Sequence, residues 1–269
     1  MVKAHFETTY EARGVLDSSL EAVKQLITDF AARRILEVGG GAHPSLGPDY
    51  IAARGLEYTV NDAREEELMK ADSTYHKLRM ELGTEEPTAL FKGRFDLIFS
   101  RIVHEHVYNI QRFHQTIHYM LAGGGAAVHC FPTLYALPFV MNRLLPECSC
   151  GGLLNFFVPG FTETHRHFRA YYRWCRGPSR RMIRRFERVG FEVVEFRGYF
   201  GHSYYQTRMP LLHKLERAKA RWLAKHPIPL LTSFSWVVLR KRNVDPGRRI
   251  SDLPPLGGVG SNHAPVDVI

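Results

Sequence analysis

The sequence predicts an α/β fold, in which helices cover both faces of a mostly parallel β-sheet. The first observation is a short apolar run at residues 35–38 that stops at three consecutive glycines, residues 39–41. Such a run is typical of a central parallel strand, and the glycines let the backbone turn sharply and approach a ligand closely. The second is another strand, residues 58–60, that leads into Asp62 about twenty residues after the glycines.

These two strands predict a ligand site at their carboxyl ends. Ligands of open α/β sheets bind at this edge, where an acid such as Asp62 can accept both hydroxyls of a ribose. A dinucleotide fingerprint needs a third glycine, but His43 and Ser45 occupy that region. The pattern therefore favours a nucleoside without a pyrophosphate over a nicotinamide dinucleotide. The structural alternative is a plain strand-to-helix turn.

With its neighbouring segments, this pattern resembles the class I S-adenosylmethionine-dependent methyltransferases, of the small-molecule type with a methyltransferase type 11-like core. The matching segments are Glu37-Val38-Gly39-Gly40-Gly41, Asn61-Asp62, and residues 95–100, 103–107 and 121–126. The resemblance covers residues 30–131 in register and residues 178–241 more loosely. It implies S-adenosyl-L-methionine as cofactor and a Rossmann-like, seven-stranded mixed sheet of order 3-2-1-4-5-7-6, whose last strand is antiparallel.

The resemblance also implies the residues that bind the cofactor. The expected set is Glu37, Gly39, Gly40 and Gly41 in the turn, Asp62 at the ribose, Glu81 near the adenine, and Ser100 and Arg101 where the fourth strand ends.

Periodicity and capping patterns predict the remaining elements. A leading helical or lid segment spans residues 1–32, with a helix that begins near Asp17. Tyr10 is either a lid over the cofactor or an aromatic anchor. Further helices are expected at residues 44–53, 63–70, 111–121 and 211–225, and strands at residues 75–81, 96–100, 126–131, 190–199 and 233–240.

Three polar residues, His104, Glu105 and His106, follow the fourth strand. Imidazole and carboxylate are common metal ligands, but ligands on one helical face are three or four residues apart. We therefore predict no metal site here. His104 is a candidate to face the methyl acceptor.

The segment at residues 132–177 is too long for a simple crossover and is rich in aromatic side chains. We expect it to form an acceptor pocket at the reaction edge, with His165 and His167 as polar members. A structural cap with surface histidines is the alternative. Residues 243–269 lack periodicity and are expected to form a flexible tail.

A helix expected after residue 178 carries arginines at helical spacing: Arg180, Arg181, Arg184, Arg185 and Arg188. A solvated helix face is the favoured explanation, and an anion-binding stripe is the alternative. Together with other basic residues they give the chain a net charge of +9.

Composition bounds the remaining possibilities. The 269 residues suffice for one large domain, which we place at residues 1–242. No apolar run of membrane-spanning length and no secretory signal is visible, so a cytoplasmic location is expected, with peripheral membrane contact left open. The four cysteines do not have zinc-site spacing.

The predicted function is methyl transfer from S-adenosyl-L-methionine to a small-molecule or lipid-like acceptor at oxygen. Oxygen acceptors usually need a base, for which His104, His165, His167 and His202 are the candidates. A nucleic-acid methyltransferase is an alternative, but the fourth strand leads into Ser100-Arg101-Ile102-Val103 rather than an Asn-Pro-Pro-aromatic tetrad. A noncatalytic cofactor-binding protein is the other alternative.

Overall fold

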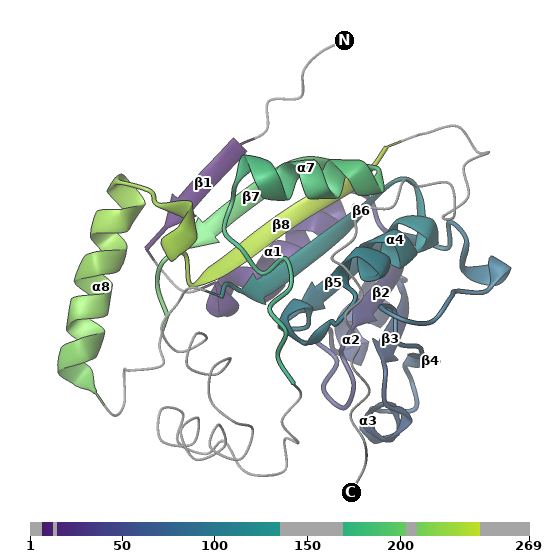
Figure 1. Cartoon of the computed structure of the whole chain (residues 1–269). Helices are drawn as coiled ribbons and strands as arrows, with labels where there is room; N and C mark the ends of the chain where they lie inside the picture. Colours follow the sequence, from purple (N-terminus) through teal and green to yellow (C-terminus); the bar gives the residue numbers. More distant parts are fainter. Residues whose placement is uncertain (1–6, 13–14, 135–168, 203–208, 243–269) are drawn as a thin grey trace, which may run out of the picture.

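A computed structural model describes residues 7–12, 15–134, 169–202 and 209–242 of the chain. Its strands form one eight-stranded sheet of order β1-β7-β8-β6-β5-β2-β3-β4 (Figure 1). The strands are β1 (Glu7–Glu11), β2 (Arg34–Val38), β3 (Glu57–Asp62), β4 (His76–Arg79), β5 (Phe95–Arg101), β6 (Leu121–Pro132), β7 (Phe191–Tyr199) and β8 (Phe234–Lys241).

The sheet confirms the predicted strand order and has one strand more than predicted. Strands β2 to β8 correspond to the seven predicted strands, and β8 runs antiparallel between β6 and β7. The additional strand, β1, pairs parallel with β7 at the sheet edge. It lies in the leading segment, where Tyr10 stacks on Phe200 at a centroid distance of 5.6 Å. This contact agrees with the anchoring alternative for Tyr10.

Helices lie on both faces of the sheet. In Figure 1, α4 (Ile110–Met120) and α7 (Arg180–Val189) cover the near face, while α1 (Leu16–Asp29) lies behind the sheet. The other described helices are α2 (Pro48–Arg54), α3 (Glu65–Lys70), α8 (Pro210–Lys225) and the short 3₁₀ turns η1 (Ala89–Phe91), η2 (His104–His106) and η3 (Pro229–Leu231). No helix in the described part of the chain has the length and apolar character needed to cross a bilayer.

Burial on both faces explains why the central strands contain continuous apolar runs. Ile35 and Leu36 of β2 and Phe99 of β5 are fully buried. Helix α7 packs onto this core through Met182, Phe186 and Val189, whose helical spacing places them on one face. The remaining faces of α7 carry its arginines.

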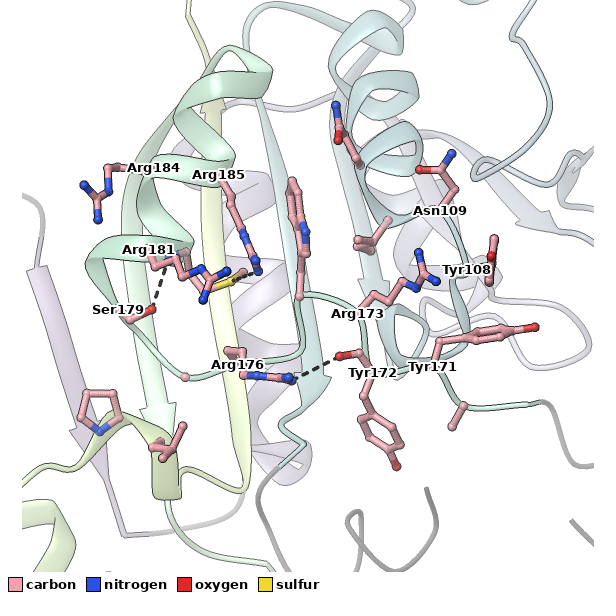
Figure 2. Close-up of a pocket in the computed structure, with 18 of the residues that line it drawn as sticks. Tyr108, Asn109, Tyr171, Tyr172, Arg173, Arg176, Ser179, Arg181, Arg184 and Arg185 are labelled. Carbon is pink, nitrogen blue, oxygen red and sulfur yellow. Dashed lines mark hydrogen bonds between the residues drawn. The ribbon is translucent and has the colours of Figure 1, made fainter. Parts of the chain in front are cut away.

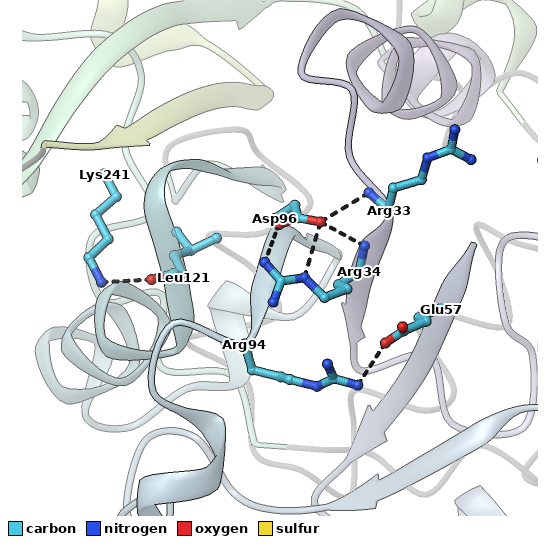
Figure 3. Close-up of polar contacts among 7 residues, drawn as sticks. All are labelled: Arg33, Arg34, Glu57, Arg94, Asp96, Leu121 and Lys241. Atoms are coloured by element: carbon cyan, nitrogen blue, oxygen red, sulfur yellow. Dashed lines mark hydrogen bonds and ion pairs between the residues drawn. The ribbon is translucent and has the colours of Figure 1, made fainter. Parts of the chain in front are cut away.

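Polar contacts hold the amino ends of the strands in register, away from the glycine turn (Figure 3). The Asp96 carboxylate accepts hydrogen bonds from the backbone N–H groups of Arg33 and Arg34, at 3.1 and 2.9 Å, and pairs with the Arg34 guanidinium at 2.6 Å. Arg94 pairs with Glu57 at 2.6 Å. The charges of these two pairs are therefore balanced within the chain.

Element boundaries differ from the prediction mainly around the ligand edge. Helix α2 begins at Pro48 rather than near residue 44, so residues 39–47 form a loop that follows β2. Strand β4 ends at Arg79, two residues before Glu81. Most of the predicted insertion, at residues 135–168, and the predicted tail, at residues 243–269, lie outside the described residues.

Candidate active site

The glycine turn at the end of β2 is packed too tightly for side chains. Gly39 and Gly41 have positive φ angles of 74° and 41°. A Cβ on Gly39 would lie 2.4 Å from Cγ2 of Val103, and a Cβ on Gly41 would lie 2.8 Å from Oδ2 of Asp62. Both conformation and space therefore require glycine at these positions.

The fold brings the turn and Asp62 together, as predicted. The backbone N–H groups of Gly39 and Gly40 both donate to the carbonyl of Asn61, at 2.9 and 3.1 Å. The half-buried Asp62 carboxylate accepts one hydrogen bond from the backbone of Arg64 at 3.0 Å, and its burial raises its pKa. Further lone pairs of this carboxylate stay available to accept hydroxyl groups.

Glu37 has a supporting role inside the chain. Its buried carboxylate accepts hydrogen bonds from the Ser45 backbone at 2.9 Å, from the Ser45 hydroxyl and from the Tyr58 hydroxyl. Burial raises the pKa of Glu37, and these hydrogen bonds oppose that shift. Arg101 donates to Ser45 Oγ at 3.2 Å and to Ser19 Oγ at 3.1 Å. Glu37 and Arg101 therefore position the loop at residues 39–47.

The sequence pattern does not identify Ser45 and Tyr58 as site residues. In the sequence, Ser45 is only a departure from a dinucleotide fingerprint, and Tyr58 is only part of a predicted strand. The strand around Tyr58 is mixed in polarity, so only the hydrogen bond between Tyr58 and the buried Glu37 carboxylate, made across paired strands β2 and β3, identifies this residue.

Ser100 and Glu81 occupy different environments. The buried Ser100 hydroxyl lies 2.8 Å from Nδ1 of His129, so it faces the interior rather than the ligand edge. Glu81 is exposed just beyond β4. The backbone of its neighbour Met80 bonds Asp62, with the Met80 N–H donating to the Asp62 carbonyl at 3.2 Å. Glu81 thus lies on the same edge as Asp62, whereas Ser100 contributes only its backbone there.

Three fully buried histidines meet in the core, although they are far apart in the sequence. The Nε2 atoms of His104 and His114 are 3.1 Å apart, and the ring centroids of His104 and His129 are 4.5 Å apart. One ring nitrogen of each residue lies within 4.8 Å of the others, a spacing compatible with a metal site. Burial lowers the pKa of all three rings, to about 3 for His114, so they are neutral.

We interpret this histidine cluster, residues His104, His114 and His129, as part of the core. Metal-bound histidines almost always donate their second ring N–H to an acceptor. Nδ1 of His104 and Nδ1 of His114 have no such partner among the described residues. Phe131 stacks on His104 at a centroid distance of 4.7 Å. His104 is therefore enclosed, while the other two predicted catalytic residues, His165 and His167, lie outside the described residues.

A pocket opens beside this site, between α4, α7 and the segment at residues 169–179 (Figure 2). The backbone N–H groups of Tyr171 and Tyr172 donate to the carbonyl of Glu105 at 2.6 and 3.1 Å. Glu105 is two residues beyond Val103, which packs on the glycine turn. The pocket and the turn are therefore connected through η2.

Comparisons with known proteins agree with this geometry. Residues 36–129, which include the glycine turn, Asp62 and β5, match a family described as "Methyltransferase domain". A search of curated proteins finds none that matches the sequence.

Solved structures give similarity at the level of the fold. A Listeria monocytogenes protein, proposed to be an S-adenosylmethionine-dependent methyltransferase, aligns with a TM-score of 0.53 at 12% identity, over 84% of this chain and 99% of its own. Haemonchus contortus phosphoethanolamine N-methyltransferase 2, bound to phosphomonomethylethanolamine and S-adenosylhomocysteine, aligns with a TM-score of 0.52 at 12% identity, over 86% of this chain and 54% of its own.

Proposed function

We propose that this chain, which belongs to the class I S-adenosylmethionine-dependent methyltransferases, methylates a small-molecule or lipid-like acceptor at oxygen. The family match confirms the predicted class, its enzymatic nature and its cofactor, S-adenosyl-L-methionine. The observation that carries the proposal is the position of Asp62 beside the glycine turn at the carboxyl ends of β2 and β3, where a Cβ on Gly41 would lie 2.8 Å from Oδ2 of Asp62. The proposal adds to the family match the class of methyl acceptor and the atom that is methylated.

The residues of the turn fit the cofactor. Glycine at positions 39 and 41 lets the turn pack directly against Val103 and Asp62, and the Asp62 carboxylate has acceptor capacity for ribose hydroxyls. When bound, the cofactor supplies an electrophilic methyl group on a sulfonium. The chain holds the cofactor and acceptor in line and excludes water, which lowers the entropic part of the barrier.

Transfer to oxygen requires a group that accepts the hydroxyl proton. His104 does not suit this role, because its ring is fully buried and its pKa lies well below the usual value. Burial also lowers the pKa of His202, to about 4, and we therefore propose His165 or His167 as the base. His165→Gln or His167→Gln should lower kcat by about 10²–10⁴-fold if that residue is the base. His226→Gln, at an exposed position after α8, is the control.

Cofactor binding tests the central observation. Asp62→Ala should weaken binding of S-adenosyl-L-methionine by about 1.5–3 kcal/mol, because hydrogen bonds to a charged group are lost. Isothermal titration calorimetry measures this change, and Asp72→Ala, an exposed aspartate in a loop, is the matched control. An unchanged dissociation constant for Asp62→Ala would refute the assigned role.

Methyl transfer to extracts tests the acceptor class. Radiolabel from S-adenosyl-L-methionine should appear in a small-molecule or lipid fraction. Labelling of RNA or DNA would instead support the nucleic-acid alternative, and no labelling with intact cofactor binding would support the noncatalytic one.

A further inference from the structure

We propose that the pocket between α4 and α7 binds a phosphate or diphosphate group of the methyl acceptor, an inference that rests on the proposed methyltransferase function. This inference rests on the positive charge of the pocket. Among the described residues, seven arginines line the pocket, and no lysine, aspartate or glutamate does. They are Arg169, Arg173, Arg176, Arg181, Arg184, Arg185 and Arg188.

The arginines of α7 are not neutralised by neighbouring acids. Among the described residues, Arg181, Arg184 and Arg188 form no ion pair with a carboxylate, unlike Arg34 and Arg94 at the other end of the sheet. Burial and the nearby charges of Arg181, Arg176 and Arg188 lower the pKa of Arg185 (Figure 2). Like charges held this close repel one another, and a bound polyanion would offset that repulsion.

Aromatic side chains hold several of these cations in place. The Arg173 guanidinium lies 4.3 Å from the ring centroid of Tyr108, and the Arg185 guanidinium lies 5.4 Å from that of Trp174. Cation–π contacts restrict the arginine side chains before any ligand binds. The donors are thus preorganised on both walls of the pocket, which lowers the entropic cost of binding.

Two helix amino termini open toward the same space. Asn109 caps α4 and Ser179 caps α7, and both capping residues line the pocket. Their partial positive charges add to those of the arginines and favour an anion. Helices that follow parallel strands begin at the carboxyl edge of the sheet, which is also the cofactor edge. An anion bound near these amino termini would therefore lie toward the carboxyl edge of the sheet.

The donor type favours phosphate over a single carboxylate. Guanidinium groups bind phosphate oxygens through paired N–H donors, and several of them can surround a group with more than one negative charge. A soluble phosphate ester and a lipid head group share this chemistry. An apolar part of the acceptor stays a prediction for the segment at residues 132–177, of which residues 135–168 lie outside the described residues.

Inorganic pyrophosphate is the first probe. Wild-type protein should bind it by calorimetry, and Arg181→Gln/Arg185→Gln should weaken binding at least tenfold. Arg173→Gln, on the opposite wall, should also weaken it. Arg180→Gln is the matched control, because Arg180 is exposed on the same helix but does not line the pocket. Equal affinity of the wild type and the double variant, or no binding by the wild type, would overturn the proposal.

Two further measurements separate the sources of phosphate and the two proposals. If the wild type binds phosphatidylcholine vesicles only when they contain phosphatidic acid, and the double variant does not bind them, the ligand is a lipid head group. If the wild type binds pyrophosphate but not these vesicles, the ligand is a soluble phosphate ester. Duplex DNA or RNA bound far more tightly than pyrophosphate, with the same loss in the double variant, would overturn the proposal in favour of nucleic acid. S-adenosyl-L-methionine affinity should be unchanged in every arginine variant, so a failure of cofactor binding refutes the proposed function separately.

Discussion

The neutral state of His114 makes a quantitative prediction about stability in acid. The ring is fully buried against Trp174 and Phe186, at centroid distances of 5.5 and 5.1 Å, and burial lowers its pKa to about 3. In the unfolded chain, a histidine takes up a proton near pH 6.5. Below that pH the unfolded state binds more protons than the folded state, so His114 reduces stability as the pH falls.

The size of the effect follows from the two pKa values. At pH 7.5 the unfolded histidine is almost uncharged, and its titration lowers the free energy of unfolding by less than about 0.1 kcal/mol. At pH 5.5 the unfolded ring is charged and the folded ring is not, which lowers the free energy of unfolding by about 1–2 kcal/mol. His114→Gln removes this titration. Its stability should therefore fall by about 1–2 kcal/mol less than that of the wild type between these pH values.

Urea unfolding at pH 7.5 and pH 5.5 measures this difference. The comparison between variant and wild type cancels the contribution of other titrating groups to the pH dependence of stability. One such group is Glu105, whose pKa is raised by burial to about 8 and which stabilises the folded state as the pH falls, opposite to His114. Ile117→Val is the control: it removes a buried methyl group from the same helix without a titration, so its cost of about 0.5–1.5 kcal/mol should be equal at both pH values. An equal acid-induced loss in His114→Gln and wild type would refute the reasoning.

Two predictions concern the glycine loop. Gly41→Ala should weaken binding of S-adenosyl-L-methionine at least about tenfold, because its Cβ would lie 2.8 Å from Asp62 at a φ of 41°. Gly47→Ala, which has nothing within 4 Å of its Cβ, should bind the cofactor normally in the same calorimetric assay. Equal affinities of the two variants would contradict the packing argument. Tyr58→Phe should lower the free energy of unfolding by about 1–3 kcal/mol, because the buried Glu37 carboxylate loses a donor. Unchanged urea unfolding of that variant would show that the hydrogen bond contributes nothing net.

The central part of the fold was predictable because its signals are local. An apolar run, three glycines and an acid after the next strand are close in sequence, and they specify the β2–β3 unit and its ligand edge. Strand β1 has no such local context. Its Thr8-Thr9-Tyr10 core has β propensity, but its partner β7 lies at the other end of the chain. Only the assembled sheet edge identifies it as a strand.

Side-chain direction in β5 could not be predicted for a different reason. A strand that is buried on both faces does not alternate between polar and apolar residues, so its sequence does not reveal toward which face of the sheet Ser100 points. The structure places the Ser100 hydroxyl against His129. His104 and His114 join the same cluster from η2 and α4, and no sequence spacing predicts that encounter. The cluster follows from the tertiary packing of three elements.

The arginine pocket shows why periodicity alone leaves charge ambiguous. Arginines at helical spacing on α7 fit a solvated face as well as an anion site, because either way the helix needs only Met182, Phe186 and Val189 for the core. Residues outside α7 distinguish the anion site from a solvated face. Arg173 and Tyr108 form the opposing wall, and they reach it because the Tyr171 backbone is hydrogen-bonded to Glu105 of η2. A charged helix face becomes a candidate binding site when a second wall of the same charge, connected to the reaction edge, lies opposite it.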